Sequence, residues 1–255
     1  MENITEKEEE KKRITVSMLI PLYFVSVLWL VYFTEYATGL DFSWLGILPR
    51  TFGGLGGIIF TPFLHGSFGH LLSNTVPLLV LGFGLIYFYR SIAYKVFLWI
   101  WFIDGFGVWI LGRESYHIGA SGLVYGMAAF LIFSGILRSN RRLLALSMAV
   151  VFVYGSLIWG MLPYIPDVSW EAHLFGFLAG VYFSVHYLRD GPANDPLPEW
   201  MSETDDEKER LQEYSGNELR PEEKISTDEE SAKPSDEIKI RYIYRSKEDE
   251  KESVD

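Results

Sequence analysis

Four polar residues within apolar segments have the side-chain types needed for nucleophilic catalysis: Ser121, His173, His70 and Asn74. A serine hydroxyl becomes an effective nucleophile when a base takes its proton, and histidine is the usual base near neutral pH. The tetrahedral intermediate also needs hydrogen-bond donors directed at its oxyanion. His70, Asn74 and the backbone N–H of Ser121 can supply such donors. Because no Asp is placed to orient the histidine, these residues predict a Ser–His dyad, with Tyr125 stacking on the imidazole.

The segments that must position these residues are long and apolar. A transmembrane helix needs about 20 predominantly apolar residues, and six segments meet this requirement. We therefore expect an all-α membrane protein, a six-transmembrane-helix bundle with a long loop after the first span. The Gly-rich connection at residues 35–67 is too long for a simple turn and predicts an ordered loop or a lateral insertion. The predicted spans are residues 14–33, 68–89, 92–112, 118–137, 143–163 and 170–188.

The distribution of Lys and Arg predicts that both termini lie in the cytoplasm, because cytoplasmic loops carry an excess of these residues. The outer side of the predicted bundle receives only Arg50 and Arg113. The second, fourth and sixth spans then all begin at the outer surface, so their first polar residues lie at similar depth. The basic residues on the cytoplasmic side are Lys11, Lys12, Arg13, Arg90, Lys95, Arg138, Arg141, Arg142 and Arg189.

The fourth and sixth predicted spans carry rows of small residues, which let helices approach closely. Such an approach could bring Ser121 Oγ within about 3 Å of a His173 nitrogen, the distance of a hydrogen bond. His70 and Asn74 are four residues apart, so they share one face of the second span. The small residues are Gly122, Gly126, Ala172, Gly176 and Gly180.

Three motifs resemble those of the rhomboid family of intramembrane serine proteases, in the family's order and on the corresponding spans. The sequence Gly119-Ala-Ser-Gly122 resembles the GxSG motif, and the segment at 172–180 resembles the AHxxGxxxG frame of the catalytic histidine. Residues 65–74 are similar to the second-span HxxxxHxxxN motif. The resemblance covers about residues 44–188.

The resemblance implies a catalytic dyad of Ser121 and His173, with His70 and Asn74 in the oxyanion site and Gly119 beside the scissile carbonyl. It also implies that single-span membrane proteins are cleaved near the outer membrane surface. The connection between the first two spans would be the family's membrane-embedded first loop. The implied partners are these substrates and the lipid bilayer.

The charged ends of the chain predict its domain organisation. Residues 189–255 carry 11 Lys or Arg and 22 Asp or Glu, which accounts for the entire net charge of −11. We expect a disordered cytoplasmic tail there, since this composition buries too little apolar surface to fold; its apolar patch at 238–244 could bind a partner. Residues 1–13 form a charged cytoplasmic N-terminus, and 14–188 form the membrane domain. The acidic tail gives no case for nucleic-acid binding. In a bacterium this multi-pass protein would lie in the cytoplasmic membrane.

Two other functions remain open. A catalytically inactive relative that binds membrane clients would typically lack the serine or the histidine, and both are present. A small transporter using His173 and Asp104 would need polar residues spread across the membrane depth, and no inverted repeat is evident. The chain has no Cys, which excludes thiolate zinc sites. We expect no metal or cofactor, because His65 and His70 are five apart and do not stack on one helix face.

Overall fold

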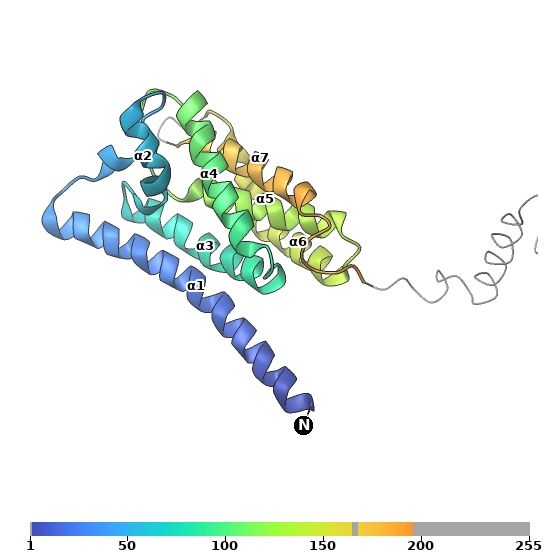
Figure 1. Cartoon of the computed structure of the whole chain (residues 1–255). Helices are drawn as coiled ribbons and strands as arrows, with labels where there is room; N and C mark the ends of the chain where they lie inside the picture. Colours follow the sequence, from blue (N-terminus) through green and yellow to red (C-terminus); the bar gives the residue numbers. More distant parts are fainter. Residues whose placement is uncertain (1, 165–167, 196–255) are drawn as a thin grey trace, which may run out of the picture. The chain divides into compact units, whose positions relative to one another are not determined.

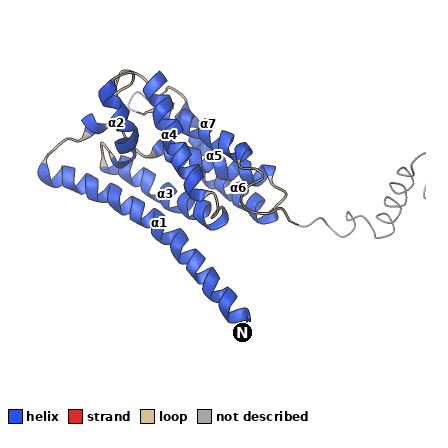
Figure 2. Cartoon of the chain, viewed as in Figure 1, coloured by secondary structure: helices blue, strands red, loops and turns tan. Residues whose placement is uncertain are grey.

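The computed structural model of the chain describes residues 2–164 and 168–195, and over these residues it is helical without strands (Figures 1 and 2). Most of the tail predicted to be disordered, residues 196–255 with the patch at 238–244, lies outside the described residues. The elements are α1 (Glu2–Thr38), η1 (Ser43–Leu45), α2 (Phe52–Phe60), η2 (Thr61–Phe63), α3 (Phe68–Phe88), α4 (Ala93–Leu111), α5 (Ser121–Leu137), α6 (Arg141–Tyr154), η3 (Gly155–Met161) and α7 (Trp170–His186).

Four helical stretches of the described chain are long and apolar enough to cross a membrane: residues 6–38, 68–88, 93–111 and 141–161. The prediction of an all-helical membrane protein is confirmed. Helices α5 and α7 have 17 residues each, which is the lower limit for a span. The count of six spans and the cytoplasmic location of both termini stay predictions.

Helix α5 is the central element of the bundle and packs on α3, α4, α6 and α7 (Figure 1). Its contact with α7 is close because glycines face each other across the interface. A Cβ on Gly176 would lie 2.1 Å from the carbonyl oxygen of Gly122, and one on Gly180 would lie 2.1 Å from that of Gly126. No side chain fits there, so the two backbones touch, as the rows of small residues predict.

The connection between α1 and α3 folds into short helices. Helix α2 begins after Thr51, whose hydroxyl accepts a hydrogen bond from the N–H of Gly54 and so caps the helix. Two tryptophans of α4 hold this insertion. Trp109 Nε1 donates to the carbonyl oxygen of Thr51 at 2.8 Å, and Trp101 Nε1 donates to that of Ile58 at 2.7 Å. The insertion is therefore fixed to the same bundle that carries the polar residues.

Candidate active site

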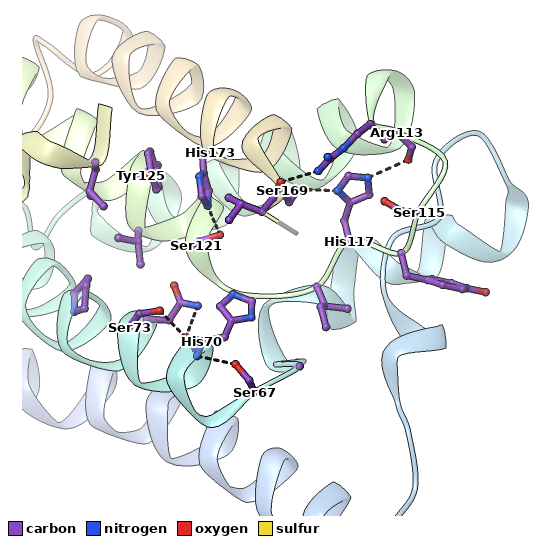
Figure 3. Close-up of a pocket in the computed structure, with 18 residues that line it drawn as sticks. Ser67, His70, Ser73, Arg113, Ser115, His117, Ser121, Tyr125, Ser169 and His173 are labelled. Carbon is purple, nitrogen blue, oxygen red and sulfur yellow. Dashed lines mark hydrogen bonds between the residues drawn. The ribbon is translucent and has the colours of Figure 1, made fainter. Parts of the chain in front are cut away.

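Ser121 and His173 come together at the start of their helices. Ser121 is the first residue of α5, and His173 lies in the first turn of α7. The distance from Ser121 Oγ to His173 Nε2 is 2.8 Å (Figure 3). The close glycine contacts between α5 and α7 place these two helix starts beside each other. The pair is thus a hydroxyl and an imidazole within hydrogen-bond reach, as nucleophilic catalysis requires.

The other nitrogen of the His173 ring determines which tautomer is present. Nδ1 lies 2.8 Å from the carbonyl oxygen of Gly160, in η3. A carbonyl oxygen only accepts hydrogen bonds, so Nδ1 must carry a proton. In the neutral ring Nε2 then has a free lone pair, which accepts the hydrogen bond from Ser121 Oγ. Sequence reasoning did not find Gly160, because any residue type provides a backbone carbonyl.

Tyr125 lies against the face of the imidazole. Its ring centroid is 4.1 Å from that of His173, and the two planes differ by 7°. Tyr125 reaches this position because it follows Ser121 by one helical turn. Gly160 packs against both side chains, since a Cβ there would lie 2.0 Å from Tyr125 Oη and 3.2 Å from His173 Nδ1. The histidine is therefore held by a ring face and a carbonyl.

A second group of residues lies opposite the dyad and consists of His70, Asn74 and Gly119. Gly119 has a φ of +115°, a conformation that L side chains rarely adopt. A Cβ at Gly119 would lie 2.7 Å from His70 Nε2 and 3.9 Å from Asn74 Nδ2. Asn74 is buried, and its Nδ2 donates to the carbonyl oxygen of His70 and lies 3.2 Å from His65 Nε2. His65 thus braces the asparagine amide, and the ring of His70 lies beside the GxSG backbone.

A cavity of about 710 Å³ joins these two groups of residues. Ser121, Tyr125 and His173 line one part of it, and His70 lines another (Figure 3). Asn74 is also among the lining residues. Its walls also include polar residues of the connection between α4 and α5, among them Ser115. The structure therefore brings together, around one cavity, all the side chains predicted to take part in catalysis.

Thr61 of the insertion holds the chain that leads into α5. Its carbonyl oxygen accepts the N–H of Gly119 at 2.9 Å, and its hydroxyl donates to the carbonyl oxygen of His117 at 3.0 Å. Ile47 and His117 pair through two backbone hydrogen bonds in a short antiparallel bridge. The insertion therefore sets the position of Gly119, a role for Thr61 that the sequence did not indicate.

Comparison with known proteins identifies the family, because the Rhomboid domain family matches residues 53–190 of the chain. The chain belongs to the rhomboid family. Uncharacterized proteins of Mycobacterium tuberculosis and Mycobacterium bovis are each 36% identical to this rhomboid over 201 residues, covering 74% of this chain and 81% of their own. An uncharacterized protein of Mycobacterium leprae is 34% identical over 180 residues, covering 67% of this chain and 70% of its own. The family and the apolar helices make this an integral membrane protein.

An ion pair ties the start of α7 to the end of α4 in this rhomboid. Arg113 Nε lies 2.8 Å from Glu171 Oε1, and Glu171 is only 2% exposed. Beside this pair, His117 Nδ1 lies 2.6 Å from Ser169 Oγ, and Arg113 Nη2 donates to the carbonyl oxygen of Val168 (Figure 3). These contacts join the segment before Ser121 to the segment before His173, so they hold together the two parts of the chain that lead into the dyad.

Asp104 of α4 lies against the backbone of α5 and not in the cavity. A Cβ on Gly122 would lie 1.9 Å from Asp104 Oδ2. Asp104 Oδ1 is buried and has no hydrogen-bond partner among the described residues. The residues described as lining the cavity do not include Asp104. The carboxyl group therefore contacts the residue after the serine without reaching the reacting atoms.

Proposed function

We propose that this rhomboid is an intramembrane serine endopeptidase in which Ser121 is the nucleophile and His173 the general base. The observation that carries the proposal is the 2.8 Å contact between Ser121 Oγ and His173 Nε2, together with the bond from Nδ1 to Gly160. The second bond leaves Nε2 as an acceptor, and that is the state in which a histidine can take the proton of a serine.

In the acylation step, Ser121 Oγ attacks the carbonyl carbon of the scissile peptide bond while its proton passes to His173 Nε2. The oxyanion receives hydrogen bonds from the side chain of His70 and from the backbone N–H of Ser121. Asn74 Nδ2 donates a further hydrogen bond when it gives up its contact with the His70 carbonyl oxygen or with His65 Nε2. The C–N bond of the tetrahedral intermediate then breaks. His173 gives its proton to the departing amine, and the substrate's acyl group remains as an ester on Ser121.

Deacylation repeats these steps with water. His173 Nε2 takes a proton from a water molecule in the cavity, and the hydroxide attacks the ester carbonyl. The same donors stabilise the second oxyanion, and collapse returns the proton to Ser121 Oγ and releases the carboxylate. Tyr125 and Gly160 keep the imidazole oriented through both steps. Gly119 lies beside the scissile carbonyl, and its lack of a side chain leaves room for the ring of His70, since a Cβ there would lie 2.7 Å from His70 Nε2.

The proposed topology has six spans, with both termini in the cytoplasm. Helices α5 and α7 would each rise about 26 Å at 1.5 Å per residue, close to the roughly 30 Å of a bilayer core. The excess of Lys and Arg at one end of the bundle supports this orientation. The cavity would then open near the outer surface, with residues 1–13 and the tail from 189 in the cytoplasm. In a bacterium, the membrane would be the cytoplasmic membrane.

The proposed substrates are single-span membrane proteins that unwind locally at the cleavage point. A stable helix hides its carbonyl groups in hydrogen bonds, whereas attack by Ser121 needs an extended segment. Substrates with Gly or Pro near the cleaved bond should therefore react faster than the same span rebuilt from Leu and Ala. Equal rates for the two substrates would contradict this part of the proposal.

The decisive experiment measures cleavage of a model single-span substrate by the purified full chain, together with labelling by a serine-reactive fluorophosphonate. We expect Ser121→Ala and His173→Ala to lose about 10⁴-fold or more of the cleavage rate and to lose the labelling. Ser26→Ala and His186→Ala are matched controls on exposed helix faces and should keep both. Labelling of the parent that persists in Ser121→Ala would place the reactive serine elsewhere. If the parent neither cleaves nor labels, the protein is instead a client-binding member of the family.

A further inference from the structure

An apolar groove lies between α1 and α4, with α3 as its floor. The two outer helices meet at Phe24, whose ring centroid lies 5.5 Å from that of Phe97 and 6.0 Å from that of Trp101. On the N-terminal side of this contact the helices leave a cavity of about 380 Å³. The walls include Val16, Ile20, Leu78, Leu85, Ala93 and Leu98.

The contact between α1 and α3 closes one side of the groove. Pro21 interrupts the hydrogen bonding of α1 and faces Gly82 of α3. A Cβ on Gly82 would lie 3.0 Å from the ring of Pro21, so α1 lies directly on α3 at this point. The opening therefore remains between α1 and α4, toward their N-terminal ends.

Arg90 is the charged residue of this groove. It follows α3 in the turn that leads to α4, and its side chain is exposed. Within the described residues, its guanidinium has no hydrogen bond or ion pair. Nearby Arg13 differs, since it donates two hydrogen bonds to the carbonyl oxygen of Tyr87 and pairs with Glu10. A free guanidinium thus stands at the end of a hydrocarbon-walled groove.

We propose that this groove binds one anionic glycerophospholipid, with an acyl chain along the apolar walls and the phosphate on Arg90. A guanidinium forms paired, charge-assisted hydrogen bonds with a phosphate group. Basic pockets between transmembrane helices on the cytoplasmic side bind anionic headgroups in this way. In the proposed topology Arg90 lies just beyond the cytoplasmic end of α3, where the headgroups of that leaflet are found.

The size of the groove favours a lipid chain over a protein helix. A helix about 10 Å wide occupies roughly 1200 Å³ over ten residues, about three times the volume of the groove. A substrate span or a helix from a second copy would therefore fit only if α1 moved away. A single acyl chain is narrower than a helix, so the proposed lipid requires no such movement.

The test is native mass spectrometry of the full chain in detergent with equal amounts of phosphatidylglycerol and phosphatidylcholine of identical chains. We expect the parent to retain phosphatidylglycerol about fivefold over phosphatidylcholine, the effect of one arginine at the membrane surface. Arg90→Gln should bind the two lipids equally. Arg141→Gln is the matched control, an exposed arginine at the start of α6 outside the groove, and should keep the parent's preference.

A second variant tests the walls independently of the charge. Ile20→Trp adds bulk to the groove at a partly exposed position and should reduce retention of both lipids. Glycerol phosphate, which has the charge but no chains, should not be retained. The proposal is overturned if the parent shows no headgroup preference or if Arg90→Gln and Arg141→Gln bind alike. Unchanged lipid retention by Ile20→Trp would also overturn it, because the lipid would then bind elsewhere.

Discussion

The carbonyl oxygen of Gly160 lies 2.8 Å from His173 Nδ1, on the edge of the ring opposite the one that meets Ser121. This neutral carbonyl stands where a serine protease triad has a carboxylate. It can select the tautomer and orient the ring, but it stabilises the imidazolium less than a carboxylate would. The orientation of the histidine in this rhomboid therefore depends on the position of the Gly160 backbone.

Gly160→Ala should lower kcat by about 100-fold, the cost of moving a catalytic group by about 1 Å. The new Cβ would lie 2.0 Å from Tyr125 Oη and 3.2 Å from His173 Nδ1, so the tyrosine or the carbonyl must shift. Gly155→Ala is the matched control in the same short helix, since its Cβ would meet only Val151 at 3.8 Å. Steady-state cleavage of the model substrate measures both variants. Equal rates would show that the Gly160 contact does not orient the histidine.

Tyr125→Leu should lower kcat by about three- to tenfold, whereas Tyr125→Phe should stay close to the parent. The stacking of the Tyr125 ring on His173 at 4.1 Å is kept by Phe and lost with Leu, and such aromatic contacts contribute about 0.5–1.5 kcal/mol. The measurement is kcat and KM for both variants, with the effect expected in kcat. If Tyr125→Phe is as slow as Tyr125→Leu, then the tyrosine hydroxyl, and not the stacking of its ring, supports kcat.

Arg113→Ala should destabilise the fold by about 1–3 kcal/mol and slow cleavage, because Glu171 would remain buried without its counter-ion. This expected loss of stability is at the low end for buried ion pairs, because the Arg113 side chain is 40% exposed whereas the Glu171 side chain is only 3% exposed. Arg113→Ala combined with Glu171→Gln removes the uncompensated charge and should recover part of the loss. Thermal unfolding in detergent and a double-mutant cycle measure the coupling. Additive effects would contradict a direct role of the ion pair.

Acid should destabilise this rhomboid partly through His117, in the connection before α5. Burial lowers the pKa of His117, and its hydrogen bond to the Arg113 carbonyl and the nearby Glu171 carboxylate oppose this only in part. The unfolded chain, with a histidine pKa of about 6.5, then binds a proton that the folded chain does not. Stability from this group is complete above about pH 6.5 and is lost as the pH falls toward the lowered pKa.

Thermal unfolding of the parent and of His117→Asn between pH 8 and pH 5 measures this contribution. The parent's Tm should fall more steeply below pH 6.5 than that of the variant. Asn can still accept from Ser169 at the position of Nδ1, but it is too short to reach the Arg113 carbonyl, which His117 contacts through Nε2. Parallel curves would show that His117 is not a source of the acid sensitivity.

The sequence indicated the chemistry because the relevant residue types are costly in a membrane. Polar residues are rare in the apolar segments, and four of them are Ser121, His173, His70 and Asn74. Because each lies near the start of a predicted span, we expected them at a similar depth in the membrane. Rows of glycines indicated which helices approach closely, and the spacing of four placed Tyr125 above the serine. These signals are local, and the resemblance to rhomboid motifs added the roles of the individual residues.

The tertiary structure alone decided which backbone groups hold these side chains. The contacts of Gly160 with His173 and of Thr61 with Gly119 use carbonyl oxygens, which every residue type has, so these two contacts could not be read from the sequence. The pairing of Arg113 with Glu171 joins residues that are far apart in sequence, and only the packing of α4 against α7 brings them together. Residue type determined what chemistry was available, whereas the path of the backbone determined how it is oriented.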